Sequence, residues 1–363
     1  MLTQDSLRAI ARRFAIEGNI TDIKPLGSGL INDTLRVCTD GKDDYVLQRI
    51  NTGIFKDVAL LQHNIESVTA HIRAKLEEQG VSEVERRVLR FLPCPETGRS
   101  WWEEDGGCWR MSVLIRDSYT HETVDPAHSR IAGRAFGQFQ AQLADLPEQL
   151  GETIPDFHNM ELRARQLHEA VNADAAGRMA IPEIAALVGE MQEWEQEMCK
   201  AERMHREGIL PKRICHCDTK VNNILFDADG QVLCVIDLDT VMPSFVFSDF
   251  GDFLRTAANT LPEDDPAADK VDFRMDIFEA FASGYLESAG GFLTKVEREN
   301  LPYAACLFPY MQAVRFLTDY INGDTYYKIK YPEHNLVRTR NQWALFKAAL
   351  SKVPQMKEIV ERA

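Results

Sequence analysis

The chain has 363 residues, enough for one large domain or for two cooperating domains of ordinary size. Hydrophobic residues make up 45% of it and charged residues 27%, which excludes a largely disordered or fibrous protein. The net charge of −15 has the wrong sign for a protein that neutralises nucleic-acid phosphates, so we expect no nucleic-acid partner.

The longest strongly apolar stretch, residues 301–314, is shorter than the roughly 20 residues of a membrane helix and contains two prolines. We therefore expect no membrane partner. Charged residues interrupt the N-terminal segment, which argues against a secretory signal and predicts a cytoplasmic protein. Nothing in the pattern marks an oligomer, so a monomer is favoured.

Strand-forming patterns dominate the first part of the chain. Short apolar or alternating runs there are separated by turns that contain glycine. One segment, residues 56–79, carries apolar side chains at steps of three and four and predicts an amphipathic helix. We expect residues 1–116 to form a small antiparallel β-rich lobe with one helix. Its strands are predicted within 22–38, on either side of the turn that contains Gly27 and Gly29, and at 44–50, 88–92, 101–102 and 109–115.

Helical periodicity dominates from about residue 125 onward and predicts a larger, mainly α-helical lobe over residues 117–363. A hairpin interrupts it, with strands near 223–226 and 231–236 joined by an Asp-Ala-Asp-Gly turn. The fold class is therefore α+β with two lobes. Helices are predicted at 131–143, 160–172, 183–206, 271–287, 295–320 and 338–352.

The hairpin and the loop before it carry the polar residues that phosphoryl transfer needs. Asp218 is followed five residues later by Asn223, and the hairpin ends at Asp237. A carboxylate can orient an attacking hydroxyl, while an amide oxygen and a second carboxylate can hold Mg²⁺ on the phosphates of ATP. We predict Asp218 and Lys220 as catalytic residues, and Asn223 and Asp237 as metal ligands. Taken singly, Asp218 and Asn223 would more simply be loop-capping residues, and Asp237 a polar residue at a strand end.

The H-x-D-x-x-x-x-N pattern of residues 216–223 resembles the catalytic loop of the aminoglycoside phosphotransferase and choline kinase superfamily. The runs ILPKRICHCDTKVNNIL, VIDLDTVMPS, DFGDFLR and KYPEHNLVRTR are similar to the N-acetylhexosamine 1-kinase family. The resemblance implies a protein-kinase-like fold and transfer of the γ-phosphate of ATP to the C1 hydroxyl of N-acetylglucosamine or N-acetylgalactosamine. It places the following residues at the substrate: Asp218, Asp239, Thr240, Arg315 and Tyr326.

Two residues near these motifs have alternative interpretations. On helical spacing alone, Arg315 would pair equally well with Asp319, one turn further along. The triplet Asp249-Phe-Gly spells the metal-binding motif of protein kinases. Because Asp237 already takes that role, we expect Asp249 to cap a helix or to brace the catalytic loop.

A glycine-containing segment between the first two predicted strands is a candidate cover for the nucleotide phosphates. It carries Gly27, Gly29 and Asn32, although two glycines at a hairpin are more often simple turn residues. Residues from Ile115 to Asp117 would form the hinge against which adenine lies. We predict this nucleotide to be ATP.

The position of the usual strand lysine of kinases holds Gln48 instead. Glu66 is expected on the helix face where the partner of that lysine would lie, and it therefore has no evident cation. The family that the chain resembles also carries glutamine there. Leu30 and Thr256 stand where that family has a histidine and a phenylalanine, so the sugar pocket is expected to differ in shape.

Two other functions stay open at this point. One is another small-molecule hydroxyl kinase of the same superfamily, acting on choline, homoserine or an aminoglycoside. The other is a nucleotide-binding protein without catalysis, which the glutamine at position 48 would favour. The complete set of Asp218, Asn223 and Asp237 argues against that second alternative.

Overall fold

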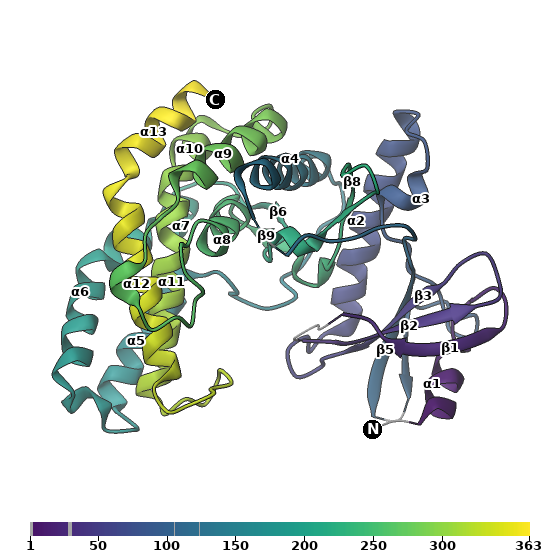
Figure 1. The fold of residues 1–363 in the computed structure, drawn as a ribbon, viewed down its shortest axis with the longest axis horizontal. Coiled ribbons are helices and arrows are strands. Elements are labelled where there is room, and N and C mark those ends of the chain that lie inside the picture. Colours follow the sequence, from purple (N-terminus) through teal and green to yellow (C-terminus); the bar gives the residue numbers. More distant parts are fainter. Residues whose placement is uncertain (1–2, 28–30, 105, 123) are drawn as a thin grey trace. The chain divides into compact units, whose positions relative to one another are not determined.

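The computed structural model describes residues 3–27, 31–104, 106–122 and 124–363. The chain forms two compact units, drawn in Figure 1. The first unit contains residues 1–120, 145–155 and 224–242, and the remaining residues form the second unit. Segments 145–155 and 224–242 therefore cluster with the first 120 residues, although they fall beyond residue 116 in the chain.

The first unit contains an antiparallel sheet that has five strands within the described residues, in the order β1-β2-β3-β5-β4. Gln48 lies opposite Arg110 in the pairing of β3 with β5, and Leu47 lies opposite Met111. Because side chains alternate along a strand, these two pairs face opposite sides of the sheet. The strands are β1 (Ile20–Pro25), β2 (Asp33–Thr39), β3 (Tyr45–Ile50), β4 (Trp101–Glu104) and β5 (Gly107–Val113).

Helices cover both faces of this sheet. Helix α1 (Gln4–Ala11) packs its buried Ile10 into the cluster that holds Leu47 and Met111. On the other side, Gln62 of helix α2 (Val58–Glu78) lies against Arg110. The predicted helix at 56–79 is thus confirmed, and Asp57 caps its first turn by accepting a hydrogen bond from the backbone N–H of Leu60.

Two predictions for this unit need correction. Residues 88–92 form no regular strand, because Phe91 makes only an isolated bridge to Ser112 of β5. The unit also has more than one helix, since α1 and the short α3 (Val84–Arg87) accompany α2. Helix α1 has only eight residues and α3 only four, three of them charged, and segments this short are weak signals of periodicity.

The predicted hairpin is present. Strands β7 (Ile224–Phe226) and β8 (Val232–Val235) pair antiparallel around a turn in which Gly230 has a φ of 75°. Only glycine adopts such an angle without steric cost. The backbone pairing of Tyr119 with Phe226 ties the hairpin into the first unit.

The second unit is mainly α-helical, as predicted. Among its described residues is the short strand β6 (Arg213–Cys215), and strand β9 (Met242–Ser244) begins at the last residue of the first unit and continues into this one. The helical ranges predicted from the sequence do not include α8 and α13. The predicted helix at 295–320 is two helices, because Pro302 starts a new one. The helices are α4 (Pro126–Leu143), α5 (Met160–Ala173), α6 (Pro182–Met198), α7 (Lys200–Arg206), α8 (Phe247–Ala257), α9 (Met275–Ala289), α10 (Lys295–Glu299), α11 (Leu301–Ile321), α12 (His334–Ser351) and α13 (Val353–Arg362).

Helices α4 and α9 pack with their backbones in close approach. A Cβ atom on Gly133 would lie 2.2 Å from the carbonyl oxygen of Phe281, and one on Gly284 would lie 2.0 Å from that of Arg130. Both contacts are shorter than any real Cβ contact, so only glycine allows this packing.

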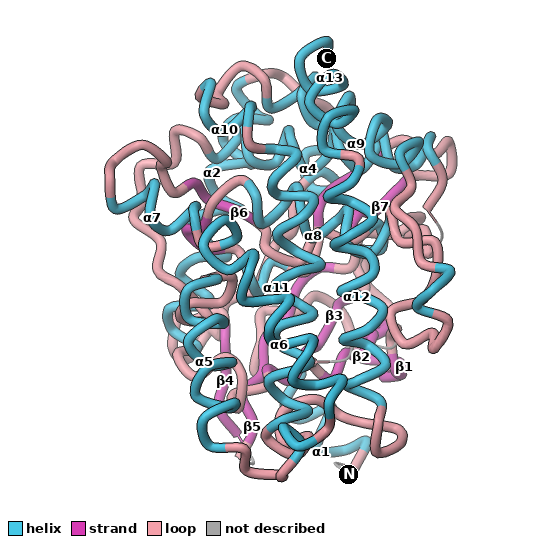
Figure 2. Tube along the Cα trace, turned by 90° about the vertical axis from the view of Figure 1, so that its left-hand side faces the viewer, coloured by secondary structure: helices cyan, strands magenta, loops and turns pink. Residues whose placement is uncertain are grey.

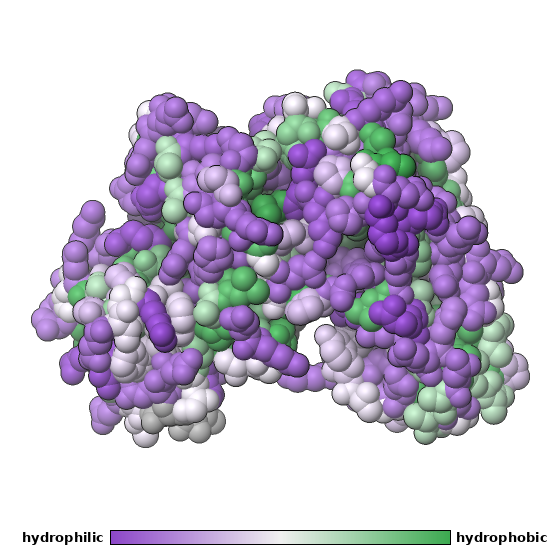
Figure 3. Space-filling model, turned by 180° about the vertical axis from the view of Figure 1, so that it is seen from behind, coloured by the Kyte–Doolittle hydropathy of each residue, from purple (hydrophilic) through white to green (hydrophobic). Residues whose placement is uncertain are grey.

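Helix α11 is the central helix of the second unit and contacts α5, α8 and α12. Figure 2 shows α11 and α12 side by side. The apolar stretch 301–314 belongs to this helix and is buried along its length, apart from the partly buried Gln312. None of the helices in the described residues is both long and apolar enough to cross a membrane. On the face drawn in Figure 3, hydrophilic side chains cover most of the surface of each unit.

Candidate active site

The predicted catalytic motif lies in the loop that follows β6 in the second unit. Asp218 is partly exposed, with 25% of its side chain accessible, and Lys220 Nζ lies 2.5 Å from Asp218 Oδ1. Burial alone would lower the pKa of Lys220, but the carboxylates of Asp218 and Asp252 outweigh it and raise that pKa. Lys220 therefore stays charged beside a carboxylate that solvent can reach.

Helix α8 holds the backbone of this loop in place through Asp249. The carboxylate of Asp249 accepts hydrogen bonds from the backbone N–H groups of His216 (2.9 Å) and Cys217 (2.8 Å). The same carboxylate accepts a bond of 2.7 Å from Gln140 of α4. Bonds to an ionised acceptor are the stronger kind, and they fix the loop just before Asp218.

The loop needs this support because its backbone is strained. Cys217 has a φ of 63°, in the left-handed region that non-glycine residues rarely adopt. Such a residue costs on the order of 1–3 kcal/mol and persists only where its surroundings impose it. Asp249 lies inside α8 and is not its N-cap residue. Its hydrogen bonds to the loop backbone give it the bracing role, which is one of its two predicted roles.

A second aspartate of α8 extends the brace. Asp252 accepts the backbone N–H of Thr219 at 3.1 Å, and Arg255 Nε lies 3.5 Å from its carboxylate. Burial raises the pKa of Asp252 to about 6, with Arg255 acting in the opposite direction. Arg255 also pairs with Glu263 at 2.5 Å. The sequence hint is the spacing Asp249 to Asp252, one helical turn, which places both carboxylates on one face of α8.

Asn223 is oriented by the same loop. Its amide nitrogen donates to the backbone carbonyl of Asp218 at 2.8 Å. The amide oxygen therefore points away from that bond, as a metal ligand requires. Asp237, in the first unit, follows β8 with a φ of 61°. Amide and carboxylate oxygens are the donors that Mg²⁺ prefers, so the chemistry of both residues fits the predicted ion.

The turn after Asp237 holds the two predicted substrate residues of the first unit. Asp239 and Thr240 are both buried in a short 3₁₀ turn, Leu238–Thr240. The carboxylate of Asp239 accepts a hydrogen bond of 2.6 Å from the amide of Asn32 and forms an ion pair of 2.6 Å with Arg110. Asn32, predicted at the nucleotide, is thus part of a buried network with Asp239.

The cation beside Gln48 is the buried Arg110, which the sequence pattern does not identify. Its Nε donates to Gln48 Oε1 at 2.9 Å, and its Nη1 lies 3.3 Å from Gln62 Oε1. Glu66 is exposed, so the expectation that it faces the strand is wrong. Gln62, one turn earlier on α2, occupies that face. Arg110 can be found only from the pairing of β3 with β5, which brings it opposite Gln48.

The remaining residues predicted to bind the nucleotide have less distinctive surroundings. Gly27 has a φ of 72°, and among the described residues a Cβ atom added to it would meet no atom within 4 Å, as expected of a turn glycine. Gly29 lies outside the described residues, as does Leu30. Ile115 is buried against Leu233 and Cys234 of β8. Their predicted contacts with ATP stay predictions.

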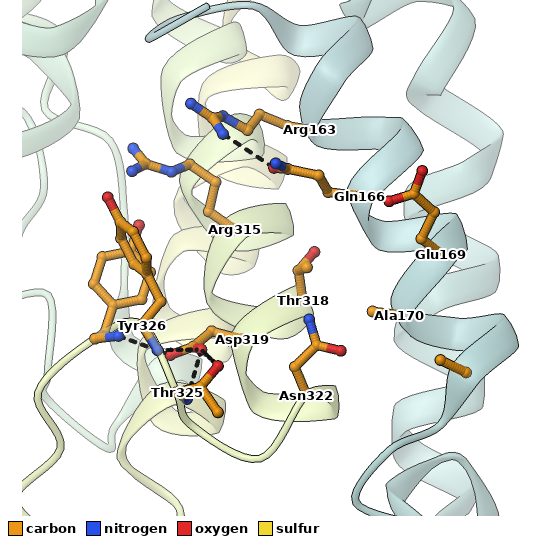
Figure 4. A pocket seen from close by; sticks show the side chains of 12 residues that line it. Arg163, Gln166, Glu169, Ala170, Arg315, Thr318, Asp319, Asn322, Thr325 and Tyr326 are labelled. Carbon is orange, nitrogen blue, oxygen red and sulfur yellow. Dashed lines mark hydrogen bonds between the residues drawn. The ribbon is translucent and has the colours of Figure 1, made fainter. Parts of the chain in front are cut away.

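Arg315 and Tyr326, far apart from the catalytic loop in sequence, line one cavity of about 420 Å³ in the second unit, shown in Figure 4. Asp319 does not pair with Arg315, because its oxygens accept the backbone N–H groups of residues 325–327 and the amide of Asn335. Asp319 thereby fixes the loop that carries Tyr326, which is 73% exposed. The alternative prediction of an ion pair between Arg315 and Asp319 is therefore wrong. The guanidinium of Arg315 stays available to a ligand.

Residues 22–292 match the model of the phosphotransferase enzyme family. The structure is similar to an aminoglycoside phosphotransferase from Alicyclobacillus acidocaldarius, with 13% identity, a TM-score of 0.62, and coverage of 100% of this chain and 97% of that one. It is also similar to a choline kinase from Cryptosporidium parvum (12% identity, TM-score 0.59, 99% of both chains). A third similar structure is an amicoumacin kinase in complex with AMP-PNP and Ca²⁺ (11% identity, TM-score 0.57, 100% of this chain and 94% of that one). These similarities confirm the predicted kinase-like fold.

Proposed function

Because this chain belongs to the phosphotransferase enzyme family, we propose that it transfers the γ-phosphate of ATP to the C1 hydroxyl of an N-acetylhexosamine, giving the sugar 1-phosphate. The coarser activity, phosphoryl transfer to a small molecule, follows from the family. The choice of ATP is supported by the amicoumacin kinase that was solved with AMP-PNP. The choice of acceptor rests on the sequence runs that resemble N-acetylhexosamine 1-kinases.

The observation that carries the proposal is the arrangement around Asp218. Its carboxylate is partly exposed, lies beside Lys220, and sits on a loop whose backbone is fixed by Asp249. A carboxylate held this way can accept a hydrogen bond from the acceptor hydroxyl and orient its oxygen toward the γ-phosphate. Lys220 can neutralise charge on the transferring group.

Asn223 and Asp237 would hold Mg²⁺, which supplies positive charge to the phosphate oxygens during transfer. The amide oxygen of Asn223 is set for this role by the hydrogen bond from its nitrogen to the carbonyl of Asp218. Through this bond, the position of Asn223, the proposed metal ligand, depends on the backbone of Asp218, the proposed base.

Arg315 and Tyr326 would bind the acceptor. A guanidinium and a phenol can both hydrogen-bond sugar hydroxyls or an acetamido carbonyl, and a site built around such donors rejects analogues that lack those groups. Arg315 is suited to this because its guanidinium makes a long hydrogen bond, 3.3 Å, to Gln312 and keeps further N–H groups for a ligand.

The test is phosphorus NMR of the products formed with ATP, Mg²⁺ and a panel of acceptors. We expect N-acetylglucosamine or N-acetylgalactosamine to give a signal coupled to the anomeric proton, which places the phosphate on C1. Turnover of choline, homoserine or an aminoglycoside, with none of any N-acetylhexosamine, would replace the proposed acceptor. Nucleotide binding without transfer to any hydroxyl would favour a non-catalytic protein.

A further inference from the structure

The cavity between α5 and α11 holds two arginines that lack a carboxylate partner within the described residues. Arg163 comes from α5 and Arg315 from α11. Figure 4 shows both guanidinium groups at one end of the cavity, with Asn322 and Thr325 at the other. Neither arginine forms an ion pair with any described Asp or Glu.

The hydrogen bonds of Arg163 leave part of its guanidinium unused. Its Nη1 donates to Gln166 Oε1 at 3.0 Å. Its Nη2 donates to the backbone carbonyls of Asp156 (3.2 Å) and Phe157 (2.8 Å). Its Nε is buried and has no hydrogen-bond partner among the described residues. These contacts fix the guanidinium in place while leaving N–H groups for a ligand.

The two charges act on each other. Burial lowers the pKa of Arg163 to about 10, and the positive charge of Arg315 acts in the same direction. Burial also lowers the pKa of the neighbouring His158, followed by the charges of Arg315 and Arg163. The surroundings of this cavity therefore disfavour positive charge, and an anion between the arginines would relieve that cost.

The nearby carboxylates do not supply this anion. Asp319 lines the cavity, but its two oxygens are used by the loop 325–327 and by Asn335. Glu169 also lines the cavity, and its exposed side chain forms no ion pair with either arginine. Asp156 raises the pKa of Arg163, but its effect comes after those of tyrosines 326 and 327.

From this arrangement we infer that the cavity between α5 and α11 binds an anionic group, a phosphate or a carboxylate, held by Arg163 together with Arg315. Two planar guanidinium groups match the oxygens of either anion and form charge-assisted hydrogen bonds with it. The inference rests on the proposed function in one respect, namely that Arg315 also serves the acceptor. The inference adds Arg163 to the residues that determine specificity. It also requires that the ligand carry a negatively charged group. That group is either a substituent of the acceptor or a free anion.

The experiment is calorimetric titration of the full chain, without nucleotide, with three probes. These are N-acetylglucosamine, N-acetylglucosamine 6-phosphate and inorganic phosphate. The proteins are the wild type, Arg163→Gln, Arg163→Lys and, as the matched control, Arg165→Gln. Arg165 lies on the same helix, is exposed and does not line the cavity.

We expect at least one phosphate-bearing probe to bind the wild type about 10-fold or more tighter than the neutral sugar at low salt. Arg163→Gln should lose most of this preference, while Arg163→Lys and Arg165→Gln should keep most of it. Arg163→Gln also loses hydrogen bonds to the backbone, so its thermal unfolding is measured to show that it is folded. Arg163→Lys keeps the positive charge, and its retained preference for the anion serves as the comparison. Salt should weaken the binding of the anion and not that of the neutral sugar.

The probes also separate the two sources of the anion. Tight binding of inorganic phosphate that competes with the phosphorylated sugar identifies a free anion as sufficient, whereas binding of the phosphorylated sugar alone identifies an acceptor substituent. The inference is overturned if neither phosphate-bearing probe is preferred, or if Arg163→Gln and Arg165→Gln retain the same preference. The titration contains no ATP and therefore does not measure phosphoryl transfer. A negative result overturns the anion site only, and the proposed function is tested separately by the product assay.

Discussion

The guanidinium of Arg110 and the carboxylate of Asp239 form an ion pair of 2.6 Å, and only 3% and 4% of the two side chains are exposed. Gln48 and Gln62 complete the surroundings of the arginine, and Asn32 those of the aspartate. A buried pair of this kind contributes little by itself, but removing one partner leaves an uncompensated charge in the interior.

We expect Arg110→Met to lower the free energy of unfolding by about 3–5 kcal/mol, because the carboxylate of Asp239 then stays buried without a cation. The measurement is urea denaturation at neutral pH. The matched control is Arg90→Met, since Arg90 forms an exposed pair with Asp43 at 3.7 Å, and such pairs contribute about 0–1 kcal/mol. Equal losses in both variants would contradict the role given to Arg110.

This network also shows where prediction from sequence stops. The loop from His216 to Asn223 and the hairpin after it are local patterns, and the structure contains both. Arg110 and Gln48 lie 62 residues apart and meet only through the pairing of β3 with β5. A periodicity argument assigns faces of a helix or strand but cannot choose the partner strand.

An error of a single helical turn in a predicted contact assigns the wrong residue to the site. Periodicity identifies α2 correctly but not which residue of its inner face meets the sheet, so it predicts Glu66 where Gln62 lies. The ion pair of Arg315 with Asp319 does not form because loop amides compete for the carboxylate. Arg163 lies on a helix that the sequence predicts, yet its approach to Arg315 depends on how α5 packs against α11.

Asp249 should act on catalysis without touching the substrate. Asp249→Asn keeps the size of the side chain but removes the charge and one acceptor oxygen, so the N–H groups of His216 and Cys217 lose part of their support. We expect kcat to fall about 10²-fold, since the strained loop no longer holds Asp218 in one position.

Steady-state kinetics at a temperature well below the unfolding midpoint separates this effect from loss of fold. The KM for ATP should stay within about 2-fold, because a positioning residue for the base acts mainly on the chemical step. Asp269→Asn, at an exposed position of the same unit, is the control. A variant of Asp249 with normal kcat would show that the loop does not depend on this brace.

The buried carboxyl of Glu202 in α7 should make the stability of the protein depend on pH. Burial raises the pKa of this carboxyl to about 7, although the N–H of Met160 donates to it and acts in the opposite direction. The folded state therefore binds a proton that the unfolded state has already released between about pH 4.5 and 7. The contribution of Glu202 to stability falls as the pH rises through that window, by about 3 kcal/mol in total.

The variant Glu202→Gln removes this titration while retaining a hydrogen-bond acceptor for Met160. We expect the difference in unfolding free energy between Glu202→Gln and the wild type to shift in favour of the variant by about 2–3 kcal/mol from pH 5 to pH 8. Urea denaturation at both pH values measures it. A difference that is independent of pH would mean that Glu202 titrates alike in the folded and unfolded states.

The most direct test of the account is the turnover of Asp218→Asn with ATP, Mg²⁺ and the best N-acetylhexosamine. Asparagine keeps the shape of the side chain but cannot serve as the base, so kcat should fall about 10²- to 10⁴-fold while the Kd for ATP stays within about 2-fold. Asp229→Asn, in the exposed turn between β7 and β8, should behave as the wild type. A normal kcat in Asp218→Asn would remove the carboxylate from its role at the acceptor hydroxyl, and the proposed mechanism with it.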